Sequence, residues 1–343
     1  MIRAGALAAL CMTTLLACGA EPPPEAAQGE ALYGAYCALC HGPQGEGYAA
    51  DNANALNNPD FLAVADDAFL RAAIRQGRPG TPMSAWGVEW GGPLSDDDLD
   101  AMVAHIRAWE TREPVQTDAI VVDGEVDRGQ DIYDVYCLTC HGPDGNGGTY
   151  MSLSNPVFLA TANDGFLREA IEHGRSQTPM QPYGNQLTYQ QIDDLVVLIR
   201  SWQVDVAAPP TELPSKTLEA PLLNPEGPEP TFPLEGRYIS TEELAAAYEE
   251  GAAMVLADAR PPSDYVLGHI SGAVSVPFFE VENYLGQLPK DRWIVAYCAC
   301  PHAESGVVAD ALEADGFSHV KVLNEGYDDW VEKGHPITPG AQP

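Results

Sequence analysis

The chain has 343 residues and a formal net charge of −33, from 50 Asp and Glu against 17 Lys and Arg. This length exceeds a usual single domain, so more than one folded unit is expected. The negative charge argues against nucleic acid and anionic lipid surfaces as partners, because both would repel the protein. A docking protein would instead present a basic face, although the same charge also suits simple solubility.

The amino-terminal segment resembles a bacterial lipoprotein signal. Arg3 precedes a short apolar run, which ends in a Leu-Leu-Ala-Cys tetrapeptide at Cys18. The resemblance implies a signal over residues 1–17, export to the periplasm or cell envelope, a lipid anchor on Cys18 and a tether over residues 18–27. An ordinary signal peptide, cut just beyond, is the alternative. No later segment approaches the roughly 18 apolar residues of a membrane span, so the lipid is the expected tie to a membrane.

Two Cys-x-x-Cys-His pentads stand 100 residues apart in the sequence. Such a pentad attaches a c-type haem: the two thiols add to the haem vinyl groups, and the His becomes the proximal iron ligand. A zinc knuckle needs a second ligand pair nearby, and a thioredoxin-like redox motif has no need of the His. The sequence therefore predicts two covalently bound haem c groups. The predicted thioether anchors are Cys37, Cys40, Cys137 and Cys140, and the predicted proximal ligands are His41 and His141.

The pentads lie within a tandem repeat. Matching strings recur at an offset that falls from 100 to 97 to 93 residues, so the second copy has lost short loop stretches. We predict one unit over residues 28–112 and a second over 123–205, each with three helices. The second helix of each runs near Asp67–Gln76 and Asp164–His173, and the third follows Ser95 or Thr188 as N-cap. Units this short bury little core alone, so a covalently held haem would supply the missing apolar centre.

With these features, each copy resembles a small class I cytochrome c, which implies an all-α fold. The resemblance also implies a distal Met ligand on the loop before the last helix, where Met83 and Met180 stand in matching Thr-Pro-Met strings. A thioether ligand favours ferrous iron and raises the potential. Core filling is the alternative for a lone Met. Candidate haem-pocket residues are Trp86, Tyr183, Arg78 and Arg175, with surface placement as the alternative for the arginines.

Eight prolines between residues 209 and 233 predict a stiff, extended linker over residues 206–235. Beyond it, residues 236–343 alternate short apolar strands, at 254–258, 293–297 and 320–323, with helices. This alternation predicts an α/β fold with a parallel sheet. Reactive groups in such sheets lie at the carboxyl ends of strands, and Cys298 stands at such an end, just before a helix.

This last region resembles a rhodanese domain over nearly its whole length. An Asp-Ala-Arg string at Asp258 and a Gly-His-Ile-Ser-Gly-Ala string at Gly268 match the early signature of the family. An Asn-Glu-Gly-Tyr string at Asn324 and a later Gly-His-Pro match the late one. The resemblance implies a nucleophilic Cys298 that accepts sulfane sulfur as a persulfide. Loop amides and the helix start would hold the anion.

The loop after Cys298 departs from the family pattern. It lacks the common Gly-x-Arg-Ser ending, and Glu304 brings a negative charge, so we expect thiosulfate to be a poor substrate. Cys300 is a candidate resolving thiol, and His302 is placed to lower a thiol pKa. The alternative is a decayed site on a docking domain.

Three functions compete for this chain. The leading hypothesis is an exported, lipid-anchored dihaem cytochrome that carries single electrons between redox proteins, with the rhodanese-like domain appended. The second is an enzyme in which Cys298 takes up sulfane sulfur or a sulfur anion and the haems remove the electrons. The third is a passive scaffold, which would survive the loss of both thiols. A Cys298→Ser change should abolish activity in the second case only.

Overall fold

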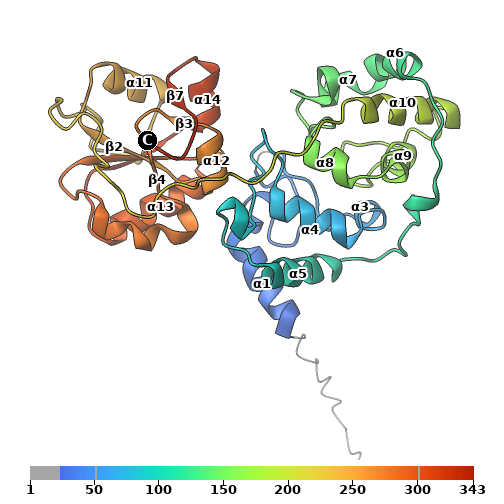
Figure 1. The fold of residues 1–343 in the computed structure, drawn as a ribbon, viewed down its shortest axis with the longest axis horizontal. Coiled ribbons are helices and arrows are strands. Elements are labelled where there is room, and N and C mark those ends of the chain that lie inside the picture. The colour runs from blue at the N-terminus through green and yellow to red at the C-terminus, as the bar shows by residue number, and fades with distance from the viewer. Residues whose placement is uncertain (1–23, 51, 300–301) are drawn as a thin grey trace, which may run out of the picture.

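The computed structural model describes residues 24–50, 52–299 and 302–343. It contains two helical repeats followed by an α/β domain (Figure 1). The predicted all-α repeats and the predicted α/β domain with a parallel sheet are therefore confirmed. The expected signal segment, Cys18 and Cys300 lie outside the described residues. Within the described ranges, no helix combines the length and the hydropathy that a membrane span requires.

The first repeat is built on two long helices that cross closely, and the pentad directly follows the first of them. The first of these, α1, packs on the last, α5, at Gly29, where a Cβ would lie only 2.1 Å from the carbonyl oxygen of Ala101. Only glycine fits this crossing. The helices are α1 (Pro24–Tyr36), α2 (Ala38–His41), α3 (Pro59–Leu62), α4 (Asp67–Gln76) and α5 (Asp96–Arg107), with a 3-10 turn η1 (Val88–Trp90).

The second repeat has the same helices in the same order. Ser95 and Thr188 cap α5 and α10 through capping boxes, and α4 and α9 have the bounds expected from the sequence. The short helices α3 and α8 were not predicted, because four to six residues carry no readable periodicity. The elements are η2 (Thr117–Ala119), α6 (Val126–Tyr136), α7 (Leu138–His141), η3 (Pro143–Gly145), α8 (Pro156–Thr161), α9 (Asp164–His173) and α10 (Tyr189–Ser201).

The two repeats pack against each other through reciprocal contacts. The side-chain amide of Asn58 donates to the carbonyl oxygen of Ser176 at 2.7 Å, and that of Asn155 donates to the carbonyl oxygen of Pro79 at 3.0 Å. These partners occupy equivalent positions in the two copies. Between them, the equivalent rings of Phe69 and Phe166 stack at 5.0 Å. The repeats are thus related by an approximate twofold axis that fixes how their pockets face each other.

The carboxy-terminal domain is a five-stranded sheet with helices on both faces. All neighbouring strands run parallel in the order β1-β6-β5-β2-β4, and β3 pairs with β7 in a separate antiparallel ribbon. The strands are β1 (Tyr238–Ile239), β2 (Met254–Asp258), β3 (His269–Ile270), β4 (Val274–Ser275), β5 (Trp293–Tyr297), β6 (Val320–Leu323) and β7 (Ile337–Thr338). The helices are α11 (Thr241–Glu249), α12 (Pro262–Leu267), α13 (Ala303–Ala314) and α14 (Gly326–Glu332), with 3-10 turns η4 (Phe278–Asn283) and η5 (Leu285–Gln287).

Much of the proline-rich segment lies on the carboxy-terminal domain. Leu223 pairs with Met254 of β2 as an isolated antiparallel bridge, and Phe232 is buried in the core on that side of the sheet. Leu218 packs against the opposite core, and its N–H donates to the side chain of Gln287. Figure 1 shows this segment returning from the second repeat, past the first repeat, to the sheet. The chain therefore brings the carboxy-terminal domain back against the first repeat.

Candidate functional site

The two pentad histidines have the same orientation. The ring Nδ1 of His41 lies 2.8 Å from the carbonyl oxygen of Asn54, and that of His141 lies 3.0 Å from the carbonyl oxygen of Met151. Burial lowers the pKa of both rings, which favours neutral imidazole. An Nδ1–H donated to a carbonyl leaves Nε2 as the nitrogen for a metal, which is the usual arrangement of a ligating His.

A buried tyrosine supports each pentad. The hydroxyl of Tyr33 donates to the carbonyl oxygen of Gly42 at 2.8 Å, and that of Tyr133 donates to Gly142 at the same distance. Both rings are at most 1% exposed and pack edge-on against a Trp of the last helix region. These bonds fix the chain just after the pentad His. These tyrosines were not predicted to have a role, although both stand four residues before the first Cys of their pentad.

The first thiol of each pentad is not set up as a thiolate. Burial raises the pKa of Cys37 and of Cys137 to about 12. A zinc site would need thiolates and further ligands. Among the described residues, the one group of three metal-binding side chains within reach of a shared ion is Glu169, Glu172 and His173, which includes neither pentad. The arrangement therefore suits thioether attachment better than zinc binding.

The methionine loops of the two repeats share one backbone conformation. The N–H of Arg78 donates to the carbonyl oxygen of Met83 at 2.7 Å, and Arg175 makes the same bond to Met180. In both loops the Met N–H lies 3.2 Å from the hydroxyl oxygen of the Thr two residues earlier. Both Met side chains are half-buried against the core. They therefore hold equivalent places, as the sequence predicted.

Each repeat also carries a desolvated guanidinium. Arg78 lies over the ring of Phe69 at 5.3 Å, and Arg175 lies over the ring of Phe166 at 5.5 Å. Burial lowers the pKa of both groups to about 10. Neither forms an ion pair with any carboxylate in the part of the chain that the structure describes. A haem brings two propionates, and these anions would suit the two cations.

In the carboxy-terminal domain, Cys298 stands directly after β5 and is 1% exposed. Its Sγ lies 3.3 Å from the hydroxyl oxygen of Ser305 in the first turn of α13. The N–H of Tyr327 donates to the Cys298 carbonyl at 2.9 Å. Gly326, with φ of +78°, approaches so closely that a Cβ would lie 2.7 Å from that carbonyl. Gly326 and Tyr327, which belong to the Asn-Glu-Gly-Tyr string, thus pack directly on the backbone of Cys298.

Acidic side chains surround this cysteine. Glu304 is buried, and its pKa is raised well above its ordinary value, first by burial and then by the negative charge that Cys298 would carry. Arg260 is committed to Asp258, with Nη2 and Oδ2 2.6 Å apart. The ring of His302 packs against Tyr238, with centroids 4.3 Å apart. Glu304 in its neutral form and Arg260 already paired with a carboxylate offer a dianionic substrate no free cation.

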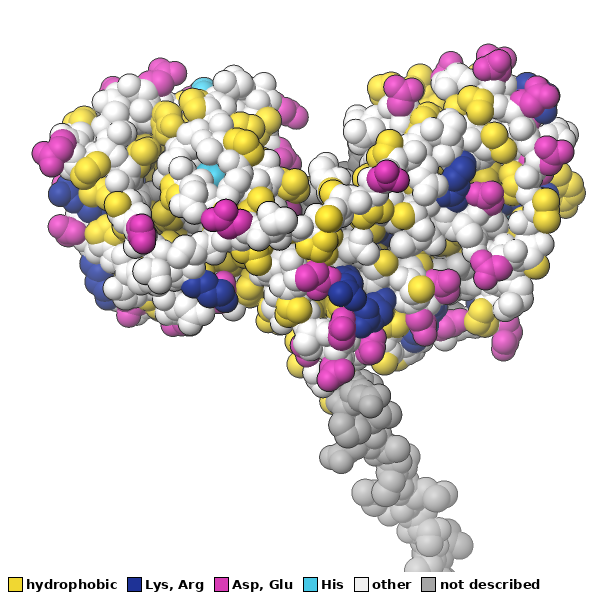
Figure 2. All heavy atoms as spheres, in the orientation of Figure 1, with side chains coloured by type: hydrophobic (Ala, Val, Ile, Leu, Met, Phe, Trp, Pro, Cys, Tyr) yellow, Lys and Arg dark blue, Asp and Glu magenta, His cyan; other side chains and the backbone are white. Residues whose placement is uncertain are grey.

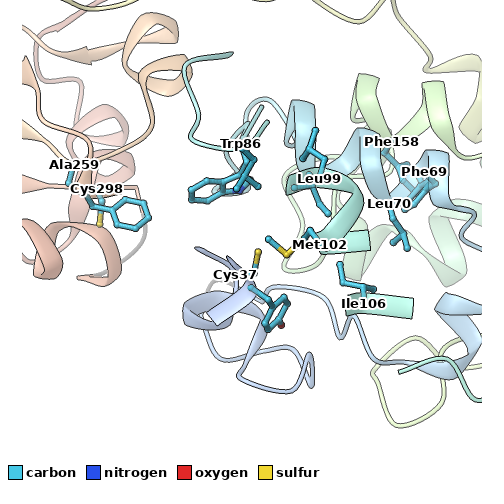
Figure 3. Close-up of a cluster of buried hydrophobic side chains, with 14 of the residues drawn as sticks. Cys37, Phe69, Leu70, Trp86, Leu99, Met102, Ile106, Phe158, Ala259 and Cys298 are labelled. Atoms are coloured by element: carbon cyan, nitrogen blue, oxygen red, sulfur yellow. The ribbon is translucent and has the colours of Figure 1, made fainter. Parts of the chain in front are cut away.

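The face of the domain that carries Cys298 packs against the first repeat. The Ser84 hydroxyl, next to Met83, bonds the Asp264 carboxylate at 2.5 Å. The rings of Trp86 and Phe278 meet edge-on at 6.0 Å. Figure 3 shows Cys298 on one side of this boundary, with Trp86 and Cys37 on the other. This contact was not predicted from the sequence.

The contact continues to the pentad. Tyr36, which directly precedes Cys37, lies 5.6 Å from the Trp86 ring and 6.4 Å from the Phe278 ring. On the other side, the N–H of Phe278 donates to the carbonyl of Ala259 at 3.0 Å. Ala259 follows Asp258, the register partner of Tyr297, so it lies beside Cys298. Three aromatic side chains therefore stand between the cysteine and the first pentad.

Known protein families match the two helical repeats and the carboxy-terminal domain separately. The model of the cbb3-type cytochrome c oxidase subunit III matches residues 24–106 and again 124–199. The model of the rhodanese-like domain matches residues 240–333. The chain is a c-type cytochrome with a rhodanese-like domain. Its cytochrome c domains imply covalently bound haem c.

Individual relatives match one part or the other. A cbb3-type cytochrome c oxidase subunit FixP of Azorhizobium caulinodans is 26% identical over 181 residues, which cover 51% of this chain and 59% of the relative. An HTH-type transcriptional regulator of Mycobacterium tuberculosis is 36% identical over 103 residues, or 30% of this chain and 45% of the relative. A sulfurtransferase of Allochromatium vinosum is 29% identical over 99 residues, or 29% of this chain and 92% of the relative. The chain thus spans about half the length of the first two.

Proposed function

We propose that this cytochrome is an electron carrier with one haem c in each repeat. The observation that supports the proposal is the repeated geometry of the two pentads, in which the His ring, the supporting Tyr and the Met loop recur with the same hydrogen bonds. In each repeat, the two Cys would hold the haem covalently, and the His and Met would be the axial ligands. The ligands are His41 with Met83, and His141 with Met180.

When bound, the haem supplies the one-electron couple, and the protein sets its potential and surroundings. The carbonyl bonds of His41 and His141 would orient the imidazoles, and Arg78 with Arg175 would neutralise propionates. We also propose that the protein is exported and held to the envelope by lipid on Cys18. Its partners would be redox proteins with basic faces.

The test is the amount of haem that stays covalently bound to the denatured chain. We expect two haems per chain, and one in the double variant Cys37→Ser/Cys40→Ser or in Cys137→Ser/Cys140→Ser. Peptide mass spectrometry should place the added mass on the pentad that each variant keeps. One haem per wild-type chain would contradict the proposal.

A second function is favoured by the aromatic contact between the Cys298 side of the rhodanese-like domain and the first pentad. The Cys298 thiolate and hydrosulfide would join as a persulfide, releasing one proton and two electrons. The two ferric haems would take one electron each. In this case the protein is a sulfur-oxidising enzyme rather than a carrier alone.

The experiment is anaerobic mixing of the oxidised protein with sulfide, thiosulfate or glutathione persulfide, beside a Cys298→Ser variant. Growth of the reduced haem band that needs Cys298, with a persulfide on that residue by mass spectrometry, is the result expected of the enzyme. Equal reduction in both proteins would leave the carrier function and remove the enzymatic one.

A further inference from the structure

The equivalent faces of the two repeats have different surroundings. In the first repeat, Tyr36 and Trp86 are covered by two Phe rings of the rhodanese-like domain. In the second repeat, the equivalent Tyr136 and Tyr183 also pair, with centroids 5.9 Å apart, but Tyr136 is 38% exposed. The ring that precedes the pentad is therefore part of a domain contact in the first copy and faces solvent in the second, where Tyr183 beneath it stays buried.

The methionine loops differ in the same way. Directly after Met83, Ser84 and Ala85 are only 4% and 5% exposed. At the equivalent places after Met180, Gln181 and Pro182 are exposed. The rhodanese-like domain thus occupies this face of the first repeat, and the second repeat keeps the same face open.

The second repeat is acidic at four exposed positions near this face, whereas the first repeat is not, although its equivalent residues are exposed as well. Along α6, Asp127, Asp131 and Asp134 follow one another at helical spacing, and all are exposed. None of them, nor Asp144 after the pentad, forms an ion pair with another described residue. The first repeat has small or neutral residues at these four positions. The equivalent pairs are Ala27 and Asp127, Ala31 and Asp131, Gly34 and Asp134, and Gln44 and Asp144.

Two acidic residues differ in the opposite direction, and both interact within the first repeat, as Asp134 does with the Gln130 side chain at 2.7 Å in the second. Glu30 and Glu46 stand where the second repeat has Gln130 and Asn146. Glu46 accepts the backbone N–H of Gln44 at 2.8 Å, and Glu30 lies on the side of α1 that faces His105 of α5. They therefore do not give the first repeat an equivalent acidic edge.

Apolar side chains lie within this acidic edge. Val135 is 73% exposed beside Tyr136, and Cys140 of the pentad is exposed as well. Figure 1 places α6 and α7 along the top of the second repeat, on the side away from the first repeat, and Figure 2 shows acidic side chains along that edge. An apolar centre with a charged rim is typical of transient docking surfaces, in which charge steers the encounter.

We propose that a redox protein with a lysine-rich face docks on this second-repeat face, formed by Asp127, Asp131, Asp134, Val135 and Tyr136. The inference rests on the proposed electron-transfer function and adds the place of exchange. Electrons would pass between the haem of the second repeat and the partner here, while the first repeat faces the rhodanese-like domain.

The test uses a small, lysine-rich cytochrome c as the probe. Its zinc-substituted form, which carries no redox chemistry, reports binding, and its iron form reports the rate of electron exchange. The variant is Asp131→Asn/Asp134→Asn in the full, haem-loaded chain. The matched control is Glu249→Gln/Glu250→Gln, which removes two exposed charges from the rhodanese-like domain. Both variants change the net charge equally.

At low ionic strength, we expect the first variant to weaken binding of the zinc probe, and to slow exchange with the iron probe, by about tenfold. This corresponds to about threefold for each carboxylate that faces an ammonium across water. The loss should disappear at high salt, and the control should change neither quantity by more than about twofold. Equal losses in both variants, or none in the first, would overturn the proposed face. A wild-type protein that exchanges no electrons with the iron probe would instead overturn the carrier function.

Discussion

Replacing Asn58 with Asp should loosen the contact between the two repeats while leaving helix α3 capped. The Asn58 side chain has two roles: its Oδ1 accepts the N–H groups of Asp60 and Phe61, and its Nδ2 donates to the carbonyl of Ser176. An Asp keeps the acceptor and loses the donor. The substitution therefore separates the inter-repeat bond from the cap.

The expected cost of Asn58→Asp is about 2 kcal/mol, because the buried side chain at position 58 loses its donated bond and places an oxygen against the Ser176 carbonyl instead. Asn58 is only 5% exposed, so water replaces the lost bond poorly. The neighbouring Asp60 carboxylate, which accepts the Ser176 N–H at 2.7 Å, adds like-charge repulsion. Asn155→Asp should behave similarly, since Asn155 makes the reciprocal bond to Pro79.

The assay is guanidinium unfolding of the haem-loaded chain, followed at the haem absorption band so that the cytochrome transition is isolated. Asn58→Ala serves as the comparison, because it loses the cap as well as the donor and should cost about 1 kcal/mol more through the cap. A transition of Asn58→Asp that coincides with that of the wild type would refute the reasoning. The second repeat offers a further check, because Val157 stands where the first repeat has Asp60, so Asn155→Asp meets no like charge. Asn155→Asp should therefore destabilise the protein less than Asn155→Ala, and a larger loss of stability for Asn155→Asp would also refute the reasoning.

Three further predictions concern the helices and the iron ligands. Gly34→Ala should stabilise the cytochrome fold by roughly 0.5–1 kcal/mol in the same unfolding assay, because a Cβ there meets nothing within 4 Å. Gly29→Ala should destabilise the fold, because its Cβ would lie 2.1 Å from a carbonyl oxygen. Met83→Ala and Met180→Ala should each lower the potential of one haem, measured by spectroscopic redox titration, and two unchanged potentials would count against thioether ligation. The pKa of Asp194 is lowered, first by hydrogen bonds from an Arg, so its carboxylate stabilises the fold above an unfolded pKa of about 3.9. Asp194→Asn should cost about 2 kcal/mol at pH 7, and the difference from the wild type in urea titrations should vanish as the pH falls through the folded pKa.

Local sequence signals were sufficient to predict the longer helices and the central strands. The ends of α4 and α9 were predicted from the Gly that follows each helix, and the structure adds an Asp or Asn N-cap at each start; both signals act within one turn of the helix. The place of Cys298 after β5 followed from a short apolar run. The pentad residues were recognisable because haem attachment fixes residue types at fixed spacing.

Contacts between distant segments could not be anticipated in this way. The Ser84–Asp264 bond joins residues 180 positions apart, and neither side chain has a pattern that names its partner. The reciprocal amide bonds of Asn58 and Asn155 were equally hidden, because a capping Asn looks the same whether or not its Nδ2 finds a carbonyl. Such contacts depend on how finished units pack, which is decided by shape and desolvation rather than by local periodicity.

Duplication explains why the two repeats share a fold but not a surface. The buried framework of each copy must keep its Tyr, His and Met contacts, because each supports the same pocket. The outer face has no such constraint once another domain covers it. In the first repeat that face keeps a Trp and a Ser that match the rhodanese-like domain, and its first helix carries Ala and Gly. In the second repeat the corresponding helix carries three Asp that no described cation pairs with. Asp127 lies in the first turn of α6, where a carboxylate suits the helix dipole, but Asp131 and Asp134 lie beyond it. Like charges along one helix cost stability, so this second pair is better explained by an encounter with a basic partner than by the fold.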